Sequence, residues 1–232
     1  DGLLNQRLDT PFIKYNGKFE KASWEEVFKI IKSKIENTSK EKISGFVGDL
    51  TNMETSYIFK EFFDRTLDSQ NYESRSDNRF SDINKRENYL FNSTINGIEE
   101  SDLIFLIGTN PRYEATILNA RIRKSFLNNN TKIISLTDLG DLTYPYECLD
   151  GQTQTLKDIF DGGHDISKAI LAANKPIIIM GESLLKSHSS KYFFNKVKKF
   201  LFKNKKVSKE WNPINILSCD ASTVGNYDLG II

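Results

Sequence analysis

The chain has 232 residues, a formal net charge of +1 and 27% charged residues. That length can bury a sizeable core, in one large or two small domains. The balance of charge argues against a dedicated nucleic-acid-binding protein, because basic contacts to phosphate supply most of that affinity. No stretch approaches the roughly 20 apolar residues that span a bilayer. The first residues have the pattern of neither a signal peptide nor an Arg-rich presequence.

Residues 1–40 are predicted to form an extended lead-in followed by one capped helix. Pro11 and Gly17 interrupt any helix over residues 1–20. Ser23 and Glu26 have the spacing of a capping box, which marks a helix start. The following apolar residues recur on one helical face, which predicts a helix packed on the core. These residues are Trp24, Val27, Phe28, Ile31 and Ile35.

Residues 41–232 alternate between strand-length apolar runs and helix-length amphipathic segments. Strands are expected at 42–47, 103–107, 132–136, 177–180 and 214–218, and helices at 52–67, 113–126, 153–160, 166–173 and 188–203. This alternation predicts an α/β fold with a doubly wound, mainly parallel sheet and helices on both faces. The α/β part could form two lobes that meet near residues 140–150.

Three segments carry more specific expectations. In the helix at 52–67, the inward side chains are predicted to be Tyr57, Ile58 and Phe62, with Phe63 as a further candidate. Residues 68–85 are polar and are expected to form a loop with little core content. The helix at 188–203 is rich in lysine and could face an anionic surface. We favour the simpler interpretation, in which lysine stems cover an apolar helix.

Ligands of such a sheet bind beyond the carboxyl ends of the strands, near helix N-termini. The candidate positions are Gly48-Asp49, Gly108–Arg112, Thr137-Asp138 and Gly181–Ser183. The second is the best equipped for a nucleotide or pterin phosphate, and it consists of Gly108, Thr109, Asn110, Pro111 and Arg112. A purely structural alternative is that Asn110 caps the helix, Pro111 occupies its first turn and Arg112 pairs locally.

Catalytic and metal-binding residues are not expected in this chain. The two cysteines, Cys148 and Cys219, are far apart in sequence, and iron–sulfur or zinc sites need grouped ligands. The two histidines, His164 and His188, lie in polar, turn-like contexts. The dinucleotide-binding glycine motif, the phosphate-binding P-loop and the hydrolase nucleophile elbow are all missing from the sequence.

The order of several motifs resembles a known family. These motifs are DGLLNQRLDTPF with GKFEKASWEEVF, NYLFNSTINGIEESD, LIFLIGTNPRYEATILNARIRKSF, DLTYPYECLD, NKPIIIMGESLL and WNPINIL followed by YDLG. Together they resemble the molybdopterin-oxidoreductase-like, Rossmann-related middle part of the 75 kDa-type large subunit of respiratory complex I. The cysteine-rich N-terminal region of that subunit does not appear in this sequence, as in a split or truncated gene.

The resemblance implies a structural part of the peripheral arm of complex I. That enzyme, an NADH dehydrogenase of the respiratory electron-transport chain, transfers electrons from NADH to ubiquinone and pumps protons, so activity is expected only in the complex. The loop Gly108–Arg112 would be vestigial and the chain free of cofactor, with iron–sulfur clusters on a separate partner chain. That partner would be the iron–sulfur part of the same subunit, beside other peripheral-arm subunits.

The implied location is the matrix side of the mitochondrial inner membrane, or the cytoplasmic side in a bacterium. Two other functions stay open at this point. One is a formate dehydrogenase-like, molybdopterin-dependent fragment that keeps its cofactor at Gly108–Arg112. The other is a free-standing nucleotide-binding module.

Overall fold

The computed structural model describes residues 5, 7–74 and 79–232. Internal contacts divide the chain into two units, one of Asp1–Val47 with Glu54–Glu73 and one of Gly48–Met53 with Ser74–Ile232. The domain boundaries expected from the sequence, at residue 40 and near 140–150, remain predictions, since a division by contacts does not show which part folds alone. Among the described residues, no helix has both the length and the apolar character to cross a bilayer.

The first unit begins with a hairpin that the predicted extended lead-in did not include. Strands β1 (Phe12–Tyr15) and β2 (Lys18–Lys21) pair antiparallel. Asn16 and Gly17 connect them with φ angles of 47° and 84°. Two successive positive φ angles make the tight hairpin turn that Asn-Gly favours. Gly17 therefore closes a turn as well as interrupting a helix.

Helix α1 (Trp24–Glu36) begins at the predicted capping box. The Ser23 amide donates to the Glu26 carboxylate at 2.8 Å, and the Glu26 amide donates to the Ser23 hydroxyl at 3.3 Å. The prediction that its aromatic stripe belongs to the core is wrong, because the helix has no buried residue. Trp24 is 59% exposed and Phe28 is 60% exposed. Periodicity identified the apolar face correctly but not its environment.

The rest of this unit packs around a small aromatic cluster. Its elements are η1 (Lys40–Lys42), β3 (Gly45–Phe46), α2 (Met53–Glu61), the π-helical η2 (Phe62–Leu67) and β4 (Tyr72–Glu73). The two strands pair in parallel. The rings of Phe59 and Tyr72 lie 4.9 and 5.7 Å from that of Phe63. A side chain at Gly45 would collide with the same Phe63 ring, so β3 and η2 are in close contact.

Two predictions for this region are wrong. Of the four side chains expected inward from 52–67, only Phe63 is buried, whereas Tyr57, Ile58 and Phe62 are 50%, 66% and 39% exposed. The π-helical turn changes the angular spacing of side chains from Phe62 on, which a regular helical period does not anticipate. Tyr57 and Ile58 precede that turn and lie on an exposed side of α2. The 68–85 segment is also more than a polar loop, because it contributes β4 and the buried Ser74 and Arg79.

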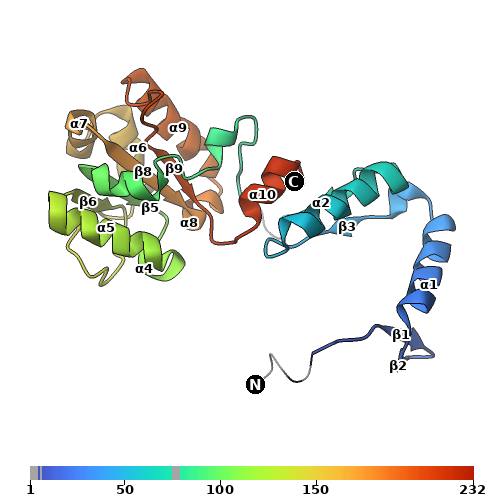
Figure 1. The fold of residues 1–232 in the computed structure, drawn as a ribbon. Coiled ribbons are helices and arrows are strands. Elements are labelled where there is room, and N and C mark those ends of the chain that lie inside the picture. Colours follow the sequence, from blue (N-terminus) through green and yellow to red (C-terminus); the bar gives the residue numbers. More distant parts are fainter. Residues whose placement is uncertain (1–4, 6, 75–78) are drawn as a thin grey trace. The chain divides into compact units, whose positions relative to one another are not determined.

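The second unit holds the predicted doubly wound sheet (Figure 1), but the strand expected at 42–47 is not part of it, because β3 pairs with β4 in a separate sheet. Its strands are β5 (Leu103–Ile107), β6 (Lys132–Ser135), β7 (Glu147–Cys148), β8 (Pro176–Gly181) and β9 (Ile214–Leu217). They lie in the order β7-β6-β5-β8-β9, and every pair is parallel. The two central strands, β5 and β8, are buried along their whole length, as continuous apolar runs in a covered parallel sheet should be.

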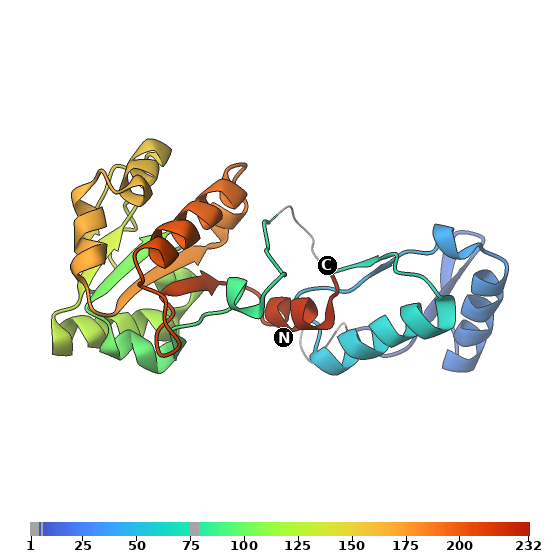
Figure 2. The ribbon, with the colours of Figure 1, turned by 90° about the horizontal axis from the view of Figure 1, so that it is seen from above.

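Helices cover both faces of this sheet, as Figure 2 shows from above. The ten helical elements described here are η3 (Arg86–Asn88), α3 (Thr94–Gly97), η4 (Ile98–Glu100), α4 (Pro111–Glu114), α5 (Thr116–Asn129), α6 (Thr153–Asp161), α7 (Asp165–Ala172), α8 (Glu182–Leu185), α9 (Ser190–Lys203) and α10 (Thr223–Leu229). One core cluster joins the sheet to α6, α7 and α9, with Phe105, Phe160 and Phe194 among its members. A second joins the opposite face to α5 through Leu118 and Ile122. The predicted layers are therefore confirmed.

Phe105 offers a direct test of this core. It is fully buried in β5, and its ring centroid lies 6.3 Å from that of Phe160. Replacing Phe105 with alanine removes the ring and leaves a cavity, so the free energy of unfolding should fall by about 3–5 kcal/mol. Urea unfolding of the purified chain measures the change. Ile117→Ala, at a position that is 70% exposed, is the control and should change it by less than about 0.5 kcal/mol.

Candidate functional site

The loop that follows β5 is built as the structural alternative predicted. The Asn110 side chain accepts a hydrogen bond from the Arg112 amide at 3.2 Å, and Pro111 occupies the first position of α4. Arg112 pairs with the Asp141 carboxylate at 2.7 Å. The Asn110 amide group also donates to the carbonyl of Leu139 at 3.0 Å. The side chains of Asn110 and Arg112 thus hold the loops after β5 and β6 together.

The helix that directly follows this loop ends after one turn, earlier than predicted. In place of one helix over 113–126, the chain forms the single turn α4 and then α5, with a break at Ala115 (φ −152°, ψ 71°). A helix dipole grows with the number of aligned peptide groups. One turn therefore provides a weak field at the loop. The single helix predicted over 113–126 is therefore wrong, and only the one turn of α4 begins at this loop.

The hydrogen-bond donors of the loop are bound by another residue of the same chain, Glu114. Its carboxylate accepts hydrogen bonds from the Thr109 hydroxyl at 2.6 Å and from the backbone amide of Asn110 at 3.1 Å. A phosphate bound here would need the same hydroxyl and amide hydrogens, and it would meet a like charge. The arrangement satisfies the loop without a ligand. Sequence reasoning missed Glu114, although an acidic residue four positions after Asn110 was the available signal.

Two glycines bring the loops after β5 and β8 into direct contact. The strand order reverses between these two strands, which is where open α/β sheets bind ligands. A Cβ at Gly108 would lie 2.5 Å from the Leu184 backbone nitrogen, and one at Gly181 would lie 2.6 Å from the Gly108 carbonyl oxygen. The Ser183 amide donates to that same oxygen at 3.1 Å. Backbone therefore packs against backbone at the point where the crevice would open.

A buried arginine pairs with several acidic residues beside the carboxyl end of β8. Arg79 is 3% exposed and donates to Asp49 at 2.6 Å and to Glu182 at 2.9 Å. Asp220 lies 3.7 Å from the same guanidinium. Thr223 donates to Asp49 at 3.3 Å and completes the cluster. Buried charges of this kind are stable only when they are paired and hydrogen-bonded.

The charge of Glu182 is stabilised by its neighbours. Burial raises the pKa of this carboxyl, but Lys186 at 2.7 Å, the Cys219 amide at 3.0 Å and Arg79 together outweigh it. The pKa of Glu182 therefore lies below its usual value. A carboxylate held in this way stays ionised in its ion pairs, so it is a poor proton acceptor at neutral pH.

The other predicted positions have structural partners as well. Asp138 accepts hydrogen bonds from the Gly140 amide and the Tyr146 hydroxyl, both at 2.9 Å, and these lower its pKa. His164 caps α7 by accepting the Ile166 amide at 3.1 Å, and His188 is exposed. Cys148 and Cys219 are free and exposed. Within the described ranges, no group of three or more acidic, histidine or cysteine side chains could hold a metal ion.

Arg79 is the residue that sequence reasoning had least cause to select. It lies in a segment that looks polar and exposed, and its immediate neighbours have no apolar periodicity. The available signal was indirect: Asp49 and Glu182 both follow predicted strands, and carboxylates that are brought together inside a fold require a cation.

Comparisons with known proteins agree with the resemblance found in the sequence. The molybdopterin oxidoreductase family model matches residues 7–232. The chain is 37% identical to the NADH-ubiquinone oxidoreductase 75 kDa subunit of Reclinomonas americana, over 100% of this chain and 35% of that protein. It is 35% identical to an NADH-quinone oxidoreductase subunit of Rickettsia bellii, over 99% of this chain and 34% of that protein. It is 35% identical to the mitochondrial NADH-ubiquinone oxidoreductase 78 kDa subunit of Neurospora crassa, over 99% of this chain and 32% of that protein.

The chain thus spans about a third of the length of these relatives. The similarity extends over practically the whole chain, so it includes the loop after β5 and both units. The predicted resemblance to the large subunit of complex I is confirmed.

Replacing Glu114 with glutamine should destabilise the loop. The two carboxylate oxygens of Glu114 accept from Thr109 and Asn110. Glutamine has one oxygen to accept with, and its NH₂ group would face the other donor, so one charge-assisted hydrogen bond is lost. We expect the free energy of unfolding to fall by about 1–3 kcal/mol in urea titrations. The control is Glu87→Gln, whose ion pair with Lys85 is long, at 3.8 Å, and solvent-exposed. An equal effect of both substitutions would contradict the role assigned to Glu114.

Glu182→Gln should change the pH dependence of stability. Because the folded-state pKa of Glu182 is lowered, its contribution is complete above the unfolded-state pKa of about 4.5 and is lost as the pH falls through the folded-state value. At neutral pH the variant should be less stable by about 3 kcal/mol, since Arg79 loses a buried partner. Urea midpoints measured from acidic to neutral pH should fall less steeply on acidification for the variant. Glu147→Gln, at an exposed ion pair, should follow the parent curve.

Proposed function

The chain belongs to the molybdopterin oxidoreductase family, and we propose that it is a structural module of the peripheral arm of respiratory complex I without a cofactor of its own. Its contribution to NADH oxidation by ubiquinone, and to the coupled proton pumping, is then made only within the complex. The observation that carries the proposal is whole-chain similarity to proteins named as subunits of NADH-ubiquinone and NADH-quinone oxidoreductases.

The geometry of the loop after β5 supports the cofactor-free part of the proposal. The Thr109 and Asn110 donors are already bonded to the Glu114 carboxylate. The Gly108–Gly181 contact brings backbone together at the switch point of the sheet. The residues present therefore do not fit the phosphates of a pterin dinucleotide, which would have to displace the Glu114 carboxylate from these donors. Gly108–Arg112 is, in this proposal, a vestigial loop.

Electron transfer within the complex then depends on other chains. The two cysteines and two histidines of this sequence cannot supply the four grouped ligands that an iron–sulfur cluster needs. We place the clusters on a partner chain, the iron–sulfur part of the same large subunit, against which this module docks beside other peripheral-arm subunits. The corresponding location is the matrix side of the mitochondrial inner membrane, or the cytoplasmic side in a bacterium.

The formate dehydrogenase-like alternative is less well supported. It needs a molybdopterin at Gly108–Arg112, where Glu114 opposes an anionic ligand. The relatives described above are named as NADH oxidoreductase subunits, which favours the complex I assignment. A free nucleotide-binding module meets the same obstacle at the same loop.

The assignment predicts that the chain migrates with complex I. Native electrophoresis of solubilised respiratory membranes, stained for NADH dehydrogenase activity and probed with an antibody to this chain, should give one coincident band. Depleting the chain should remove the assembled band, because the peripheral arm would lose a module. Absence of the chain from the active band would refute the proposal.

Two measurements on the purified chain separate the alternatives. Metal analysis should give far less than one molybdenum or tungsten per chain, whereas a stoichiometric amount would favour the molybdopterin enzyme. A ligand that binds only the folded state raises the unfolding temperature. A nucleotide panel should therefore leave that temperature unchanged, and an increase with any nucleotide would favour the nucleotide-binding module.

A further inference from the structure

Helix α9 packs one apolar side into the core and carries five lysines on the rest of its surface. Its apolar side is buried in the core through Phe193, Phe194, Val197, Phe200 and Leu201. Its lysines are not spread evenly over the remaining surface. Several of them border two neighbouring hollows, and Lys196 and Lys199 line both.

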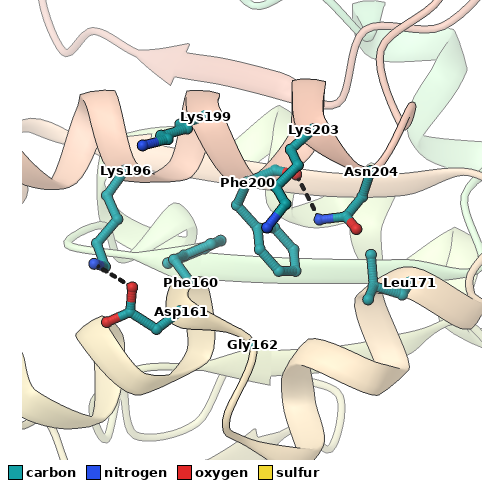
Figure 3. Close-up of a pocket in the computed structure, with 9 residues that line it drawn as sticks. All are labelled: Phe160, Asp161, Gly162, Leu171, Lys196, Lys199, Phe200, Lys203 and Asn204. Carbon is teal, nitrogen blue, oxygen red and sulfur yellow. Dashed lines mark hydrogen bonds and ion pairs between the residues drawn. The ribbon is translucent and has the colours of Figure 1, made fainter.

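The first hollow has an apolar floor. It encloses about 360 Å³ between α9 on one side and α6 with α7 on the other (Figure 3). Phe160 and Phe200 form the base, and Leu171 closes the α7 side. The two rings are almost fully buried, but Leu171 is 37% exposed. An apolar side chain entering this hollow would therefore remove carbon surface from water on both partners.

The border of the same hollow is positively charged. Lys196 pairs with Asp161 at 2.6 Å, and this is the acidic side chain that lines the hollow. Lys199 and Lys203 form no ion pair with any residue in the described part of the chain. Figure 3 shows Lys196 and Lys203 extending from α9 toward the helices below. Three ammonium groups and one carboxylate leave a net positive charge over the apolar floor.

The second hollow continues the first along α9. It encloses about 570 Å³ and is lined by Lys191, Tyr192 and Asn195 together with the shared Lys196 and Lys199, and by His188 at its end. Among the residues that the structure describes, no acidic one lines it. We call the surface bordered by Lys191, Lys196, Lys199 and Lys203 the lysine groove. From the first to the last lysine it extends about 18 Å, at 1.5 Å per helical residue.

We propose that the lysine groove binds an acidic, partly apolar polypeptide segment of another complex I subunit. Charge complementarity defines the partner: the cations lie at intervals of three to five residues along one helix, which matches carboxylates spaced along a chain. A single phosphate group would instead need donors that converge on one point. A membrane surface is flat and would not enter the recess between α9 and α7.

The first test uses the intact complex, since this inference rests on the proposed membership of complex I. A carbodiimide joins lysine amines to carboxylates in contact, and mass spectrometry identifies the linked peptides. We expect links from Lys199 and Lys203 to aspartate or glutamate residues of one neighbouring subunit. Lys157 and Lys209, which are exposed and lie outside the groove, are the internal controls. A complex that contains the chain but links only the controls would overturn the inference and leave the proposed function standing.

The second test uses the purified full chain and does not depend on the complex. The probe is a fluorescein-labelled peptide that alternates glutamate with leucine, and its binding is followed by anisotropy. K199E/K203E should weaken binding at least about tenfold, whereas K157E/K209E, with the same change of charge, should not. Circular dichroism confirms that both variants fold. Equal binding by the two variants, or binding of phosphatidylglycerol vesicles but not of the peptide, would refute the proposal.

Discussion

The buried positive charge of Arg79 constrains the segments that meet beside the carboxyl end of β8 in the second unit. A guanidinium removed from water is tolerated only beside carboxylates at hydrogen-bonding distance, so Asp49 and Glu182 are fixed where they lie. This requirement joins segments that are far apart in sequence: residues 48–53, the chain around Arg79, the start of α8 and the turn after β9. It also determines what these acidic residues can do. Carboxylates at strand ends often bind ligands, whereas here they neutralise an internal cation.

Glu114 extends the same principle to the loop after β5. A carboxylate of the chain takes the hydrogen-bond donors that make such a loop a phosphate site. The glycine contact between β5 and β8 adds backbone packing at the place where this topology would put a ligand. Topology alone therefore indicates where a site could lie, and the partners of each polar group decide whether one is there.

Sequence patterns predicted the second unit well because its signals are strong. In a parallel sheet covered by helices, apolar runs such as β5 and β8 form buried strands. A periodic apolar stripe such as that of α9 packs against the sheet. The same periodicity failed for α1, where Trp24 and Phe28 are exposed, because a stripe shows which face is apolar and not what covers it. Arg79 and Glu114 could not be found in this way. Arg79 depends on contacts with residues far away in sequence, which local composition does not encode. The position of Glu114 four residues after Asn110 is a local signal, but apolar periodicity does not detect it.

The uncovered stripe on α1 has a practical consequence for the isolated chain. Trp24, Phe28 and Ile31 present large apolar side chains to water at 59%, 60% and 45% exposure. Contact between two such stripes removes that surface from solvent, so self-association will increase with protein concentration. Sulfate and phosphate strengthen apolar association, whereas a low concentration of urea weakens it. The buffer chosen for purification will therefore determine whether the chain is recovered as a monomer or as an aggregate.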